Sequence, residues 1–258
     1  SYKKQKKIKQ YCKKKNIIFL SSAFDIESLK FLRSLKLKIF KVPSGEITNL
    51  PYLIELGKFK KKVLLSTGAS EINDIKLAIK ILTTNGTKKK NIVLLHCNSD
   101  YPTPFKDTNL NSIKFLQSKF NIKVGFSDHT LGIEASIGAV TMGAQVIEKH
   151  FTLNGNLEGP DHKASINERQ LVNMIKGIRN IEIALGKKDK FVTPSEKKNR
   201  NKIRKSIVAN KFIRRKDKFT VHNITCKRPG HGISPIFWKK VLGKQAKKNF
   251  KKDELIKL

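Results

Sequence analysis

Two tripeptides in the chain end in histidine, Ser-Asp-His at His129 and Glu-Lys-His at His150. Each directly follows a short apolar run, residues 122–126 and 145–147 respectively. Two imidazoles at the ends of neighbouring strands can share one divalent metal ion, with water or substrate in the remaining positions. A lone histidine would be interpreted as a structural hydrogen-bonding residue, but a matched pair favours metal ligands. Because oxygen groups surround them, Mn²⁺ or Mg²⁺ suits the pair better than a closed zinc site.

A cation, a hydroxyl and a carboxylate lie within six residues, at Lys41, Ser44 and Glu46. Together with the hydroxyls of Ser22 and Ser127, they could bind a phosphate or carboxylate. Taken alone, the 41–46 segment fits an ordinary surface turn equally well.

Two further polar residues lie on turns rich in Gly and Pro. Asp161, in Gly-Pro-Asp-His, could hydrogen-bond a polyhydroxy substrate or belong to a simple Pro-Asp turn. Arg228, in Arg-Pro-Gly-His-Gly, suits a carboxylate or acetamido group, although a plain loop explains that segment as well.

Short apolar runs recur between residues 17 and 147, and segments of helical period separate them. The runs are residues 17–20, 37–42, 63–65, 92–95, 122–126 and 145–147. Such continuous hydrophobicity is typical of strands buried on both faces of a parallel sheet, so the pattern predicts a βα repeat. Polar residues follow every run, as at the active face of a barrel. The absence of G-x-G-x-x-G after the first run and of a P-loop makes nucleotide binding less favoured. The polar residues at the ends of all six runs favour a (β/α)₈ TIM barrel over an open doubly wound sheet.

A barrel needs eight strands, and six are predicted. The chain begins at Ser1 rather than Met, and residues 2–15 are typical of the tail of a helix. We therefore expect an N-terminally truncated α/β barrel that lacks its first two βα units, over residues 1–191. Residues 192–203 are predicted as a linker, and residues 204–258 as a small β-rich domain.

The composition excludes some classes of function and indicates a cellular location. The 258 residues include 55 Lys and Arg against 20 Asp and Glu, for a net charge of +35. The lysines spread over every linker and helix without an RNA-recognition motif or arginine-rich arm, which argues against specific nucleic-acid binding. No apolar run is long enough to cross a membrane. Three widely spaced cysteines form no disulfide framework, which fits a cytoplasmic protein.

Six motifs resemble, in order, those of bacterial N-acetylneuraminate (sialic acid) synthases, whose close relatives make legionaminate and pseudaminate. They are Val42-Pro43-Ser44-Gly45-Glu46, His96-Cys97 with Tyr101-Pro102-Thr103-Pro104, Gly125-Phe126-Ser127-Asp128-His129, Glu148-Lys149-His150-Phe151-Thr152, Gly159-Pro160-Asp161-His162 and Lys227-Arg228-Pro229-Gly230. The resemblance covers essentially the whole chain, and its C-terminal part is similar to the antifreeze-like SAF domain, a β-clip fold.

The resemblance implies a reaction. Phosphoenolpyruvate condenses with an open-chain N-acetylated hexosamine, either N-acetylmannosamine or a 2,4-diacetamido relative, giving a nine-carbon 2-keto acid and phosphate. A divalent metal, usually Mn²⁺, activates the sugar aldehyde. C3 of phosphoenolpyruvate attacks that aldehyde, and water adds at C2.

The resemblance also implies roles for individual residues. His129 and His150 would bind the metal, His150 within the catalytic centre, and Glu46 would handle a proton. Phosphoenolpyruvate would contact Ser22, Lys41, Ser44 and Ser127, and the sugar would contact Glu46, Tyr101 and Asp161, with Asn98 or Ser99 adding a polar contact. Arg228 would reach from the SAF domain of one subunit into the barrel of another, which implies a domain-swapped homodimer.

Two departures from the family pattern stand out. Ser22 occupies a position where Thr is usual, and the two βα units that supply an acidic residue and a phosphate-binding lysine do not appear. We therefore expect the chain by itself to be weakly active or inactive. The alternatives are a non-catalytic sugar- or phosphate-binding remnant, another phosphoenolpyruvate-dependent aldol synthase or lyase, and a basic nucleic-acid-binding protein.

Overall fold

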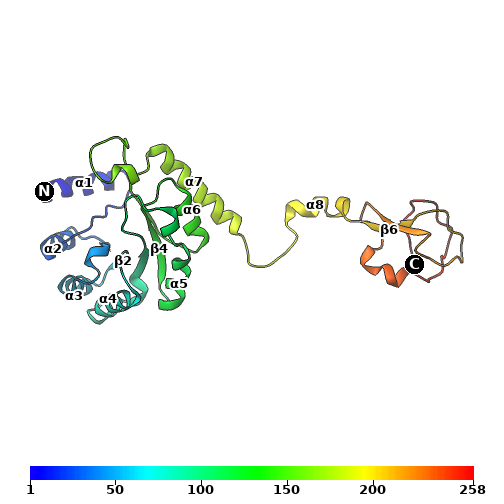
Figure 1. Cartoon of the computed structure of the whole chain (residues 1–258), viewed down its shortest axis with the longest axis horizontal. Coiled ribbons are helices and arrows are strands. Elements are labelled where there is room, and N and C mark those ends of the chain that lie inside the picture. The colour runs from blue at the N-terminus through cyan, green and yellow to red at the C-terminus, as the bar shows by residue number, and fades with distance from the viewer. The chain divides into compact units, whose positions relative to one another are not determined.

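The structure is a computed structural model that describes all 258 residues. The chain divides into two compact units, residues 1–186 and residues 187–258 (Figure 1). None of the helices is long and apolar enough to cross a membrane.

The first unit is built on a curled sheet of five parallel strands. They are β1 (Ile39–Val42), β2 (Lys62–Ser66), β3 (Ile92–His96), β4 (Lys123–Asp128) and β5 (Ile147–Lys149). The strands lie in the order of the sequence, and every neighbouring pair is parallel. An order without reversal is that of a barrel wall, because a doubly wound sheet must change direction at a switch point. The predicted partial barrel is therefore confirmed as a half-barrel.

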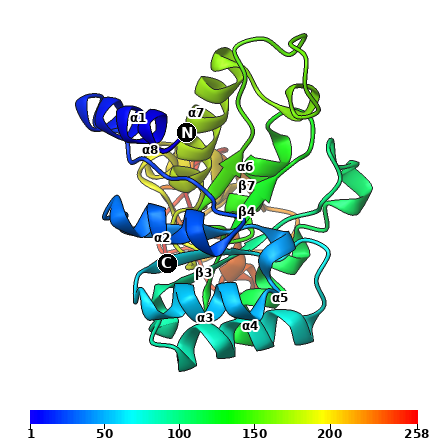
Figure 2. The same cartoon turned by 90° about the vertical axis from the view of Figure 1, so that its left-hand side faces the viewer.

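Helices follow one another around the convex face of this sheet (Figures 1 and 2). They are α1 (Tyr2–Lys14), α2 (Ile26–Ser34), α3 (Leu50–Lys58), α4 (Ile72–Thr84), α5 (Asn111–Phe120), α6 (Glu134–Thr141) and α7 (Glu168–Leu185). Short 3₁₀ turns occupy Ser44–Glu46, Lys89–Asn91, Phe105–Asp107 and His162–Ala164.

The strands are apolar on both faces because both faces are covered. Val63 and Leu65 of β2 pack in the main core with the helices, whereas Leu64 between them joins Val93 and Leu95 in a second, smaller cluster. Alternate residues of a strand point to opposite faces, so the second cluster lies on the concave side of the sheet. This explains why each run is continuous rather than alternating in hydrophobicity.

The predicted strand at residues 17–20 does not form, and this expectation is wrong. Ile17 and Ile18 are 64% and 77% exposed, and the segment has no regular structure. The nearest pairing with β1 is an isolated parallel bridge between Ser22, just after this segment, and Lys41. A β ladder requires several successive backbone pairs, and a single bridge leaves the preceding residues outside the sheet.

The second unit is small and rich in β-bridges. Helix α8 (Pro194–Ile203) occupies most of the segment predicted as a linker, and Thr193 caps it with a capping box. Strands β6 (Ser206–Ala209) and β7 (Ile224–Lys227) are antiparallel, and a 3₁₀ turn at Pro235–Phe237 leads into α9 (Trp238–Val241). Phe219 and Phe250 pack edge to face in a compact core of their own.

Candidate active site

A cavity of about 590 Å³ opens at the carboxyl ends of the strands of the first unit. In a parallel barrel wall this edge collects the residues that follow every strand. The lining residues are Ser22, Phe24, Lys41, Pro43, Ser44, Gly45, Ser66, Cys97, Ser99, Tyr101, Ser127, His129, Glu148 and His150. The fold thus brings together most of the predicted site residues, from segments more than a hundred residues apart in the chain.

His129 and His150 face the cavity side by side, with ring centroids 5.3 Å apart. The Tyr101 ring packs against both, at 4.1 Å from His129 and 5.5 Å from His150. His129 Nδ1 lies 2.5 Å from the Asn98 carbonyl oxygen, so this nitrogen carries the proton and donates it. The lone pair of His129 therefore resides on Nε2, which lies 3.3 Å from the Ser127 hydroxyl.

This arrangement fits a metal ligand. Burial lowers the pKa of His129, although the Asn98 carbonyl opposes that shift, so the ring stays neutral at neutral pH. A neutral imidazole whose other N–H is held by a backbone carbonyl is the usual form of a metal-bound histidine. No cluster of three or more His, Cys, Asp or Glu side chains forms a complete protein cage. Water and substrate would have to supply the other ligands beside His129 and His150.

Asp161 is brought back to His150 by the long loop between β5 and α7, which stands at the top of Figure 2. Its Oδ2 atom lies 3.7 Å from Nδ1 of His150. The Asp161 side chain remains more than half exposed, so it is open to a ligand as well. Asp161 therefore lies beside the predicted metal site, although it does not line the cavity itself.

Lys41, Ser127 and Glu148 form a connected polar group on the cavity wall. The Glu148 Oε1 atom lies 3.1 Å from Nζ of Lys41 and accepts a 2.6 Å hydrogen bond from the Ser127 hydroxyl. Lys41 is buried, and its charge is paired with this carboxylate. Sequence reasoning missed Glu148 as a site residue. It precedes His150 by two positions, as Ser127 precedes His129, and residues two apart on a strand share a face.

Ser44 and Asn98 are held by the backbone around the cavity. The Ser44 hydroxyl accepts a hydrogen bond from the Gly68 amide at 3.1 Å and lies 3.4 Å from the Cys97 sulfur. Asn98 contributes its carbonyl to His129, while its side chain accepts from the Asp100 amide at 2.8 Å. Of the two alternatives weighed for a polar contact, only Ser99 lines the cavity.

Glu46 and Arg228 lie outside the cavity lining. The Glu46 carboxylate accepts a 2.6 Å hydrogen bond from the Asn49 side chain, which in turn caps α3. Arg228 belongs to the second unit, where its Nε atom donates to the Ile203 carbonyl at 3.1 Å. The roles predicted for both residues stay predictions.

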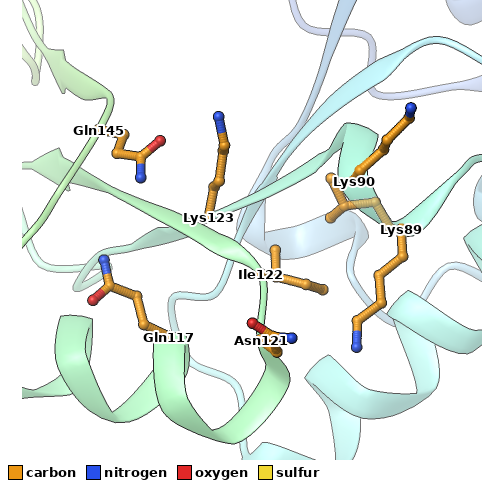
Figure 3. A pocket seen from close by; sticks show the side chains of 8 residues that line it. Lys89, Lys90, Gln117, Asn121, Ile122, Lys123 and Gln145 are labelled. Atoms are coloured by element: carbon orange, nitrogen blue, oxygen red, sulfur yellow. The ribbon is translucent and has the colours of Figure 1, made fainter.

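A second hollow, of about 380 Å³, lies at the opposite edge of the sheet, where β3 and β4 begin (Figure 3). Three lysines, Lys89, Lys90 and Lys123, line it together with Gln117 and other polar side chains. It contains none of the predicted site residues. The amino ends of parallel strands seldom carry chemistry, so the cavity at the carboxyl ends is the candidate active site.

Two family models together match nearly the whole chain. The model described as the NeuB family matches residues 1–190, and the model described as the SAF domain matches residues 204–258. The chain belongs to the NeuB family. The resemblance to sialic acid synthases read from the six motifs is thereby confirmed.

Individual relatives of this NeuB-family chain agree with that assignment. N,N'-diacetyllegionaminic acid synthase of Campylobacter jejuni is 49% identical, with 99% of this chain and 76% of the relative covered. Pseudaminic acid synthase of the same bacterium is 33% identical, with 99% and 74% covered. The crystal structure of N-acetylneuraminic acid synthetase from Leptospira borgpetersenii, in complex with citrate, matches with a TM-score of 0.72 and 32% identity. That match covers 77% of this chain and 69% of the solved one.

Proposed function

We propose that this NeuB-family protein condenses phosphoenolpyruvate with an open-chain N-acetylated hexosamine, forming a nine-carbon sialic-acid-type 2-keto acid and phosphate. The observation that carries the proposal is the cavity in which Lys41, Ser127 and Glu148 adjoin His129 and His150. A cation and hydroxyl donors beside two imidazoles support the proposal, because such groups can hold an anionic enol and, with a metal ion, activate an aldehyde.

The wall formed by Lys41 and the serines would hold phosphoenolpyruvate. Lys41 offers an ammonium group, and the hydroxyls of Ser22, Ser44 and Ser127 offer neutral donors around it. Ser22 lies next to Lys41 through the isolated bridge, so both segments present their side chains to the same part of the cavity. This arrangement would orient the enol with C3 directed at the aldehyde carbon.

His129 and His150 would bind a divalent ion, Mn²⁺ in our proposal, with Mg²⁺ as the other candidate. When bound, such an ion polarises the aldehyde oxygen of the sugar. Tyr101 packs on both imidazoles and would contact the sugar, and Asp161 would hydrogen-bond its hydroxyls. Glu46 is our candidate for moving a proton at the sugar oxygen.

The atoms of the reaction balance with one water. C3 of phosphoenolpyruvate bonds to the aldehyde carbon, whose oxygen takes up a proton. Water then adds at C2 and loses a proton, and cleavage of the C2–O bond releases inorganic phosphate. The residues of this chain would position the two substrates and exclude competing water rather than form a covalent intermediate.

For the sugar we propose the 2,4-diacetamido relative rather than N-acetylmannosamine. The chain is 49% identical to a synthase named for N,N'-diacetyllegionaminic acid and 33% identical to one named for pseudaminic acid. We also propose a domain-swapped homodimer, in which Arg228 of one subunit contacts the sugar bound by the other. Analytical ultracentrifugation tests this dimer.

The test of the reaction is product formation by the purified chain. The chain is incubated with phosphoenolpyruvate, MnCl₂ and each candidate sugar, and mass spectrometry detects the keto acid while a colorimetric assay detects phosphate. We expect both products only when both substrates are present, most with the 2,4-diacetamido sugar. Mass spectrometry matters because we expect low turnover from the chain by itself, and the same assay tests that expectation.

Two variants make the result specific. Lys41→Ala removes the cavity cation from β1, and Lys62→Ala, at the exposed amino end of β2, is the matched control. Product should fall only in Lys41→Ala. If phosphoenolpyruvate and Mn²⁺ bind but no keto acid forms with any sugar, the chain is a non-catalytic binding protein and the proposal is wrong.

A further inference from the structure

A buried ion pair joins β4 and β5 directly behind the two cavity histidines. Nζ of Lys149 lies 3.0 Å from Oδ2 of Asp128, and the two side chains are 3% and 0% exposed. The pair faces away from the cavity, since the same Asp128 oxygen accepts a 2.6 Å hydrogen bond from Ser136 on α6. Neither residue lines the cavity.

The pair holds the backbone on both sides of His129. Oδ1 of Asp128 accepts from the Thr130 amide at 2.8 Å and from the Thr130 hydroxyl at 2.7 Å, so the carboxylate spans the histidine between them. Nζ of Lys149 also donates to the Thr130 carbonyl at 2.5 Å. The residue that precedes His150 is thus bonded to both residues that flank His129.

The backbone ladder between the two strand ends is short. Strand β5 has three residues, and Asp128 opposite Lys149 is the last pair of its ladder with β4. Beyond that pair, the segments that follow β4 and β5 have different backbone partners. The His129 carbonyl accepts from the Thr103 amide, and the His150 carbonyl accepts from the Ile166 amide. On the cavity side, the Tyr101 ring and the hydrogen bond from Ser127 to Glu148 also link the two ends, so behind the imidazoles this last pair holds their relative position.

Stability alone is a poor explanation for such a pair. Two charges lose their hydration when they are buried, and an apolar pair of similar volume is often as stable or more stable. An ion pair with five directed bonds provides a defined geometry, which an apolar contact lacks.

We propose that Asp128 and Lys149 are positioning residues that hold His129 and His150 at the separation required to share one divalent metal ion. This inference rests on the proposed metal-binding role of the two histidines. It assigns the pair no contact with substrate or metal.

The test measures Mn²⁺ binding to the 258-residue chain, with free Mn²⁺ followed by electron paramagnetic resonance. Lys149→Met keeps most of the length of the side chain and removes its charge. We expect Mn²⁺ affinity to fall about 10- to 100-fold, as is common when a group supporting a metal-bound histidine is removed. Leu82→Ala, at a buried position of α4, is the matched control, because it destabilises the fold without touching the strand ends.

The double variant Asp128→Asn with Lys149→Met separates positioning from stability. It leaves no uncompensated buried charge, so thermal stability should recover relative to Lys149→Met. Mn²⁺ affinity should remain low, because the bond from Lys149 to the Thr130 carbonyl is still missing. Recovery of affinity together with stability overturns the inference. If Lys149→Met fails to fold, the Mn²⁺ affinity of the double variant provides the test instead.

His129→Ala distinguishes this inference from the proposed function. If His129→Ala abolishes Mn²⁺ binding and Lys149→Met leaves it unchanged, only the positioning role is wrong. If His129→Ala binds Mn²⁺ as tightly as the unmodified chain, or the unmodified chain binds none, both the metal site and the positioning role are wrong.

Discussion

Ser127 and Glu148 are cross-strand partners in β4 and β5, and the Ser127 hydroxyl donates a 2.6 Å hydrogen bond to the Glu148 carboxylate. The same carboxylate oxygen lies 3.1 Å from the ammonium group of Lys41. Three strands of the half-barrel therefore meet in one polar group at the cavity wall. Both residues line the cavity, so the carboxylate would compete with an anionic substrate for the charge of Lys41, and this makes the charge balance at the wall testable.

Glu148→Gln should not weaken the binding of phosphoenolpyruvate. The amide oxygen can still accept from Ser127, while the negative charge next to Lys41 is gone, so the attraction of Lys41 for an anion increases. We expect affinity in isothermal titration calorimetry to stay equal or rise a few-fold. Glu55→Gln removes the same charge from a surface pair with Lys58 and serves as the control. A tenfold loss of affinity in Glu148→Gln would show instead that the carboxylate is needed to hold Lys41 in place.

Lys41→Met should weaken phosphoenolpyruvate binding by about 10- to 100-fold. A hydrogen bond to a charged group contributes about 1.5–3 kcal/mol, and methionine fills the same buried space without the charge. Calorimetry measures the loss, and Lys62→Met at the amino end of β2 should behave like the unmodified chain. Equal affinities in the two variants would remove Lys41 from the binding site.

Tyr52→Phe should loosen the Ser22 side of the cavity. Tyr52 is fully buried in α3, and its hydroxyl donates a 3.0 Å hydrogen bond to the carbonyl of Ala23, next to Ser22. Without that donor the buried carbonyl is left unpaired, at a cost of about 1–3 kcal/mol. Urea denaturation should show this loss of unfolding free energy. Tyr11→Phe, at an exposed tyrosine of α1, should show none.

The first unit should become less stable as the pH falls below the usual pKa of histidine, about 6.5. Burial lowers the pKa of His96 in the folded chain, where the ring contacts the Thr108 carbonyl at 2.8 Å. The unfolded chain therefore binds more protons between its own pKa and the lower folded one, and unfolding free energy decreases across that window. Burial lowers the pKa of His129 as well, which acts in the same direction.

His96→Gln checks this linkage. Urea denaturation at pH 7.5 and pH 5.5 should give a smaller difference in unfolding free energy for His96→Gln than for the unmodified chain. His222→Gln, at an exposed position of the second unit, is the control. An undiminished difference in His96→Gln would mean that His96 does not contribute to the acid sensitivity.

Sequence alone determined the local features of this protein. The apolar runs that became β1 to β5 are recognisable because both faces of a barrel strand are buried, so their hydrophobicity is continuous. The polar residues after each run were recognisable as a cluster because parallel strands end at one edge. His129 and His150 were predicted to be neighbours for this reason, and their rings lie 5.3 Å apart.

Tertiary structure decided which groups face one another. Residues 17–20 have the composition of a strand but lie outside the sheet, because strand formation depends on a neighbour in register and only Ser22 finds one. Glu148 and the pair of Asp128 with Lys149 have ordinary charged side chains that resemble a solvated strand end in the sequence. Only the register of β5 against β4 shows that Glu148 faces the cavity and that the ion pair lies behind it, because contacts across strands carry no signal in local spacing.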